Sequence, residues 1–68
     1  MLIHKKDLDI VFNLRNVDYF QIRDKTLCIY ISRKSSVLIF TYSSDIEARA
    51  ALYKILQTKQ AKKEIVEI

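Results

Sequence analysis

The sequence predicts a small α+β domain: a four-stranded antiparallel β-meander followed by one C-terminal α-helix that packs on one face of the sheet. Apolar residues recur with a period of two from residue 8 to residue 42, and short polar segments interrupt this pattern. The pattern changes to a helical period after residue 44. A chain of 68 residues has room for one small hydrophobic core, so we expect a single domain over residues 1–68.

The four expected strands are separated by polar turns. The strands cover residues 8–14, 17–23, 27–33 and 37–42. The turns cover residues 15–16, 24–26 and 33–36. The first strand shows the alternation most clearly, because Leu8, Ile10 and Phe12 are separated by single residues and therefore share one face.

The fourth strand is apolar on both faces, since Thr41 is its one polar residue. One face of the sheet packs under the helix, so the other face is expected to carry exposed apolar side chains. From the fourth strand this second face takes either Val37 and Ile39 or Leu38, Phe40 and Tyr42. We predict that it is an interaction surface, formed by Val11, Tyr19, Cys28, Tyr30, Phe40 and Tyr42.

Three occupants of this face are considered: a second copy of the chain, a nucleic acid, and the chain's own ends at residues 65–68 or 1–3. Self-association is favoured, because a symmetric dimer buries the same patch twice and adds stability that a small core lacks. The sequence therefore predicts a homodimer.

A helix is expected from Asp45 to about Lys62. Ser44 and Glu47 have the spacing of a capping box, and Asp45 and Glu47 lie where the helix dipole favours acids. The predicted buried stripe consists of Ala48, Leu52, Ile55 and Leu56. Neither glycine nor asparagine marks the end of the helix.

Both termini allow more than one structure. Residues 64–68 fit a short strand or extended tail, and the spacing from Ile55 to Ile65 also fits a continued helix. Residues 1–7 fit a short strand or a loose end. The prediction therefore includes a short fifth strand at either terminus.

Composition excludes several classes of function. The chain has no glycine, so the phosphate-binding loops of nucleotide-binding proteins and the nucleophile elbow of hydrolases are absent. One Cys and one His are too few for an internal disulfide or a structural zinc site. Cys28 lies between Leu27 and Ile29 in an expected strand, which favours a packing role over a reactive thiolate. We therefore expect no enzymatic activity and no cofactor or metal.

No membrane segment is expected. The longest uninterrupted apolar run covers residues 27–31, whereas a spanning helix needs about 20 residues. The first nine residues contain no apolar signal-peptide region, and we expect a cytoplasmic protein that does not interact with membranes.

The charge is +4, from 12 Lys and Arg against 8 Asp and Glu, which raises nucleic-acid binding as an alternative. Tyr19, Tyr30 and either Phe40 or Tyr42 could stack on bases. The candidate phosphate contacts lie near strand ends and turns: Arg15, Arg23, Lys25, Arg33 and Lys34. Solvated surface charge explains the same residues, and the RNP1 motif of RNA-binding sheets needs glycines that this chain lacks.

The sequence thus predicts a small accessory protein without a cofactor, acting as a homodimeric binding module through its sheet face and recognising another protein. The alternative is a single-stranded nucleic-acid-binding protein that uses the same basic, aromatic face.

Overall fold

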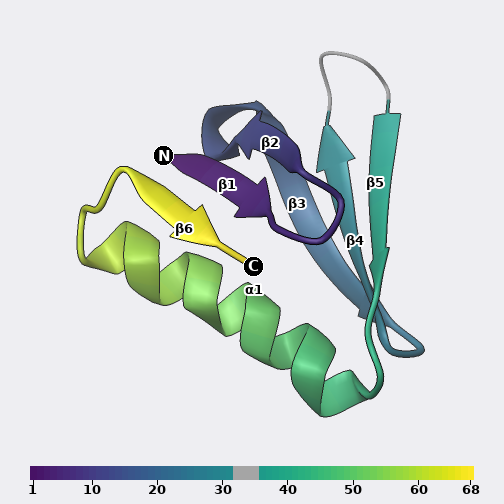
Figure 1. The fold of residues 1–68 in the computed structure, drawn as a ribbon. Coiled ribbons are helices and arrows are strands. Elements are labelled where there is room, and N and C mark those ends of the chain that lie inside the picture. The colour runs from purple at the N-terminus through teal and green to yellow at the C-terminus, as the bar shows by residue number, and fades with distance from the viewer. Residues whose placement is uncertain (32–35) are drawn as a thin grey trace.

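The computed structural model describes residues 1–31 and 36–68, and these residues form an α+β fold (Figure 1). The elements follow in the order β1 (Leu2–Lys5), β2 (Ile10–Asn13), a 3₁₀ turn η1 (Leu14–Asn16), β3 (Val17–Arg23), β4 (Thr26–Ile31), β5 (Ser36–Thr41), α1 (Asp45–Gln60) and β6 (Ile65–Glu67). The strands form two three-stranded sheets, which we call sheet A (β2-β1-β6) and sheet B (β3-β4-β5).

Sheet B is the antiparallel meander that the alternation predicts, with three strands in place of four. Tyr19 pairs with Tyr30 and Ile22 with Leu27 between β3 and β4, and Cys28 pairs with Ile39 between β4 and β5. The predicted turn at residues 24–26 is a two-residue hairpin at Asp24 and Lys25. Residues 32–35, which include most of the predicted connection at 33–36, lie outside the described residues.

Sheet A joins the two ends of the chain, and it corrects the four-stranded meander. The predicted first strand, residues 8–14, is shortened to β2 and pairs antiparallel with β1 rather than with β3. Strand β6 runs parallel to β1 on its other side, with Ile3 opposite Val66. Both termini are therefore strands, which confirms the alternative of a short strand at residues 1–7 and at residues 64–68 over a loose end or a continued helix.

Helix α1 and sheet A both cover the inner face of sheet B (Figure 1). The core is one cluster that draws on both sheets and the helix: Ile3, Leu27, Ile29, Phe40, Ala51, Ile55 and Val66. Sheet A, which the local pattern does not predict, thus buries part of the apolar side chains that one sheet with one helix would leave exposed.

The helix begins where the capping box predicts. The Ser44 Oγ accepts from the Glu47 backbone N–H at 3.2 Å, and the Glu47 carboxylate accepts from the backbone N–H of Ser43 at 3.1 Å. The buried face differs from the prediction, because Ala51 is buried beside Ala48 and Ile55, whereas Leu56 is exposed. Two alanines on this face let the helix backbone lie close to the sheets.

Turns that would normally use glycine are made by charged residues. Positive φ angles occur at Asp9 (51°), Asp24 (43°), Lys25 (65°) and Lys62 (56°). Asp24 and Lys25 form the hairpin of sheet B, where both central residues need positive φ to match the strand twist. The Lys25 backbone N–H donates to the Asp45 carboxylate at 2.6 Å, which connects this hairpin to the start of α1.

Candidate interaction surface

The outer face of sheet B is the face opposite the core. Side chains alternate along a strand, and residues paired across strands point to the same side. The register therefore places nine side chains outward in three rows: Tyr19, Tyr30 and Val37; Gln21, Cys28 and Ile39; Arg23, Thr26 and Thr41. We call these nine residues the outer face.

The outer face exposes apolar side chains beside three exposed polar ones, Gln21, Arg23 and Thr41. The exposed fraction is 55% for Tyr19 and 61% for Ile39, and Val37 is also exposed. Cys28 is the exception, since its short side chain sits among its neighbours with 7% exposed, which confirms a packing role for this free thiol. Arg23 is the one charged residue among the nine, so two such faces could approach without a large desolvation cost.

Two tyrosines form a rigid feature on this face. The rings of Tyr19 and Tyr30 are stacked, with centroids 4.2 Å apart and planes inclined by 18°. The Tyr30 hydroxyl donates to the Gln21 side-chain oxygen at 3.0 Å. Tyrosine gives a large contact area with few rotatable bonds, so two rings fixed by stacking and by a hydrogen bond suit a binding surface.

The prediction that Phe40 and Tyr42 belong to the exposed face of the sheet is wrong. Phe40 is 2% exposed and packs in the core, 6.3 Å from the ring of Phe12. The sequence left both faces of this strand open, and pairing with β4 decides between them: Val37 and Ile39 point outward instead. Val11 is exposed as predicted, but it belongs to β2 in sheet A and is not part of the outer face.

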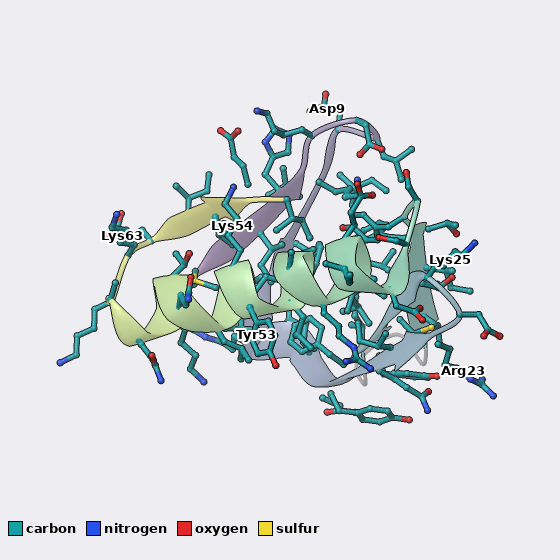
Figure 2. The ribbon with its side chains drawn as sticks, turned by 90° about the horizontal axis from the view of Figure 1, so that it is seen from below. Asp9, Arg23, Lys25, Tyr53, Lys54 and Lys63 are labelled. Atoms are coloured by element: carbon teal, nitrogen blue, oxygen red, sulfur yellow. The ribbon has the colours of Figure 1, made fainter. Side chains whose placement is uncertain are left out.

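The three candidate phosphate contacts that the structure describes, Arg15, Arg23 and Lys25, do not gather into one basic patch. Arg23 and Lys25 lie at the β3–β4 hairpin, and Arg15 lies in η1 at the opposite end of β3. Arg33 and Lys34 lie outside the described residues. Figure 2 shows Arg23 and Lys25 at one end of the molecule and Lys63 at the other. A backbone-tracking groove needs its cations along one path, and Arg15, Arg23 and Lys25 lie at the two ends of β3.

A buried lysine forms a polar cluster that the sequence did not predict. Lys5 is 6% exposed, and its ammonium lies 5.6 Å from the ring centroid of Phe40 and 5.1 Å from that of Tyr42. It pairs with the Asp7 carboxylate. The hydrogen bond and charge of Lys5 lower the pKa of Asp7. These contacts compensate the buried charge, as a structural role requires.

The Tyr42 hydroxyl is the weak point of this cluster. Among the described residues it has no hydrogen-bond partner, although it is buried. Burial and the nearby negative charge of Asp7 raise the pKa of Tyr42. An unpaired buried hydroxyl costs stability, so this residue offers a direct test of the packing.

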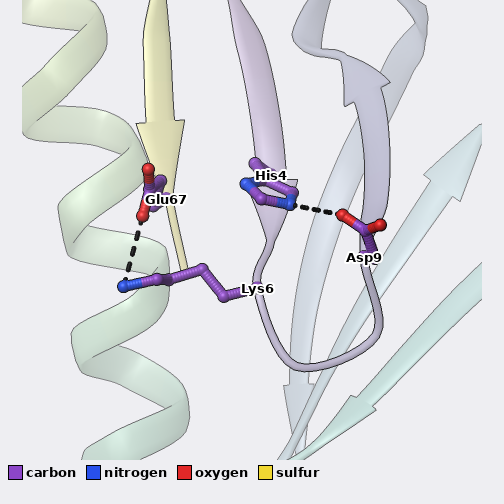
Figure 3. A network of polar contacts seen from close by, with 4 residues as sticks. All are labelled: His4, Lys6, Asp9 and Glu67. Carbon is purple, nitrogen blue, oxygen red and sulfur yellow. Dashed lines mark hydrogen bonds and ion pairs between the residues drawn. The ribbon is translucent and has the colours of Figure 1, made fainter.

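A hydrogen bond and an ion pair on the surface stabilise sheet A (Figure 3). The His4 Nε2 lies 3.0 Å from the Asp9 carboxylate across the β1–β2 turn, and Lys6 Nζ lies 3.3 Å from the Glu67 carboxylate. Within residues 1–31 and 36–68, no group of three or more His, Cys, Asp or Glu residues could hold a metal ion.

Fold and surface together define a small α+β protein in which the outer face of sheet B exposes Tyr19, Val37 and Ile39. Comparison with family models, with curated proteins and with solved structures gave no match. In the part of the chain that the structure describes, no helix is long and apolar enough to cross a membrane.

Proposed function

We propose that this protein is a non-catalytic binding module that works as a homodimer through sheet B and presents the outer face for contact. The observation that supports the proposal is the exposed apolar group Tyr19, Val37 and Ile39 on a sheet whose other face packs against the core. A partner that covers this group removes apolar surface from water, which stabilises the complex.

Charge favours self-association through sheet B, beside the contact of the outer face with a protein partner. Each chain carries +4, so two copies repel one another except where they meet through an uncharged region. Sheet B supplies such a region, since β4 and β5 contain no charged residue. The small core gives a further reason, because association adds to the stability of the folded state.

Sedimentation equilibrium at micromolar concentration tests the homodimer. The wild-type protein should have twice the 8.1 kDa of one chain. Ile39→Lys should yield a monomer, because it places a charge in the uncharged region without removing a core contact. Ile46→Lys is the matched control, since Ile46 is 79% exposed on α1 and belongs neither to the outer face nor to β5, and this variant should remain dimeric. A wild-type monomer over the whole concentration range would refute the proposal.

Single-stranded nucleic-acid binding is the second candidate, and the exposed stack of Tyr19 and Tyr30 supports it. Fluorescence anisotropy with labelled single-stranded DNA and RNA at two salt concentrations separates the two functions. Affinity that falls steeply with salt and again in Tyr30→Ala would establish this second function. Absence of binding at 50 mM salt, a condition chosen to favour electrostatic contacts, would exclude it.

A further inference from the structure

Strand β5 has one edge paired with β4 and the other edge unpaired by any described element (Figure 1). The backbone N–H of Tyr42 donates to the Lys25 carbonyl at 2.8 Å, so at Tyr42 the backbone groups face β4 and its hairpin. Because these groups alternate along an antiparallel strand, those of Val37, Ile39 and Thr41 face away from β4. The free edge therefore presents three N–H and C=O pairs, evenly spaced about Ile39.

The other three sheet edges carry features that discourage pairing between molecules. Strand β3 contains Asp18 and Arg23 and has an irregular register between Val17 and Tyr19. Strands β2 and β6 are four and three residues long. Short strands, charges and bulges are the usual protections of an exposed edge. Strand β5 has none of them: it is six residues long, regular in register and uncharged.

We infer that two copies of the chain pair antiparallel along β5, about a two-fold axis at Ile39, and form one continuous six-stranded sheet from two sheets B. This inference rests on the homodimer proposed above and specifies how its copies meet. In this register Ile39 pairs with its own symmetry mate and Val37 pairs with Thr41 of the second copy. Each of these pairs exchanges two N–H···O bonds, so all of the outward backbone groups named above are satisfied.

A second copy fits this edge better than an unrelated strand for two reasons. The outward groups are symmetric about Ile39, so the edge is complementary to itself under a two-fold rotation. The strand also contributes no charge, which lets two chains of charge +4 approach at this edge. The pairing leaves the outer faces of both copies on the same side, where they form one larger apolar surface for a protein partner.

A proline substitution tests the edge directly. Ile39→Pro removes the N–H that faces the second copy and leaves the hydrogen bonds to β4 in place, since proline is tolerated on an unpaired edge. This variant should sediment as a monomer with an unchanged circular dichroism spectrum. Tyr30→Lys is the matched control: Tyr30 lies in the central strand of the outer face, and its replacement should leave the dimer intact.

A cross-link provides a second measurement that does not depend on the folding of the proline variant. In a Cys28→Ala background, Ile39→Cys places two thiols at the two-fold axis, where paired Cα atoms are about 5.5 Å apart. Disulfides span Cα distances of about 4.4–6.8 Å, so mild oxidation should yield a covalent dimer. Ile46→Cys in the same background should not form one in the same time.

The results separate this inference from the homodimer itself. A wild-type monomer would overturn both. A dimer that dissociates in Tyr30→Lys and gives no cross-link at residue 39 would show face-to-face packing, which refutes the edge pairing and leaves the homodimer standing. An Ile39→Pro variant that is folded and dimeric would also refute it.

Discussion

Lys62 follows the C-terminal end of helix α1 in the left-handed region, and replacing this lysine with glycine should stabilise the protein. Lys62 has a φ of 56°. Its backbone N–H donates to the Lys59 carbonyl at 3.0 Å, and the N–H of Lys63 donates to the Thr58 carbonyl at 3.2 Å. These two bonds form a Schellman motif, in which the residue after the C-cap is most often glycine.

The expected gain follows from two opposing effects. A left-handed conformation costs a non-glycine residue about 1–2 kcal/mol, and glycine avoids this strain. The greater freedom of glycine in the unfolded chain offsets about 0.4–1 kcal/mol of that gain. The difference is about 0.5–1 kcal/mol in favour of the folded state, which should raise Tm by about 2–8 °C in a domain of this size.

Urea and thermal unfolding at one fixed protein concentration measure this gain. Lys62→Ala is the reference, because it removes the same positive charge near the helix C-terminus and keeps the strained Cβ. Ala61→Gly is the control at a position with φ of −76°, where glycine relieves no strain and should destabilise the fold. If Lys62→Gly proves no more stable than Lys62→Ala, the left-handed lysine is not strained and the reasoning fails.

Three further predictions concern the polar groups. Asp7→Asn should make the free energy of unfolding depend less on pH under acidic conditions. Lys5 lowers the folded-state pKa of Asp7, so the wild type loses this stabilisation as pH falls below the unfolded value of 3.8. Urea unfolding that shows the same pH dependence for variant and wild type would contradict this. Tyr42→Phe should be neutral or stabilising at pH 7. It should also remove the loss of stability that the wild type shows above pH 10, because the pKa of Tyr42 is higher in the folded state than in the unfolded state. A variant destabilised at pH 7 would mean that the hydroxyl has a hydrogen-bond partner. Ser44→Ala should cost about 1 kcal/mol through loss of the bond to the Glu47 N–H, whereas Ser44→Asp should retain most of the stability in the same assay.

The local sequence pattern predicts the positions of the strands and the helix better than it predicts which strands pair. The alternation located β3, β4 and β5 to within two residues at each end, and the capping box at Ser44 located the start of α1. These signals are local, because they depend on side-chain period and on hydrogen bonds within one turn. The pairing of β2 with β1 was missed, since four residues of alternation fit either neighbour equally well.

The interaction surface was predicted only in part, for a related reason. Tyr19, Cys28 and Tyr30 were placed on the correct face, because their strands have one clearly apolar side. Strand β5 is apolar on both sides, and its orientation depends on the register with β4, which the sequence pattern does not contain. Burial of Lys5 was missed as well, since the aromatic rings that surround it come from residues more than 30 positions away.

The parallel pairing of β1 with β6 also affects when folding can be completed during synthesis. Leu2 lies opposite Ile65, a separation of 63 residues (65 − 2). Closing so long a loop is slow compared with forming a hairpin. During synthesis the β1–β2 hairpin can form early, but Ile3 cannot be covered until residue 67 has left the ribosome. The nascent chain therefore carries an uncovered part of its own core for as long as β6 has not emerged.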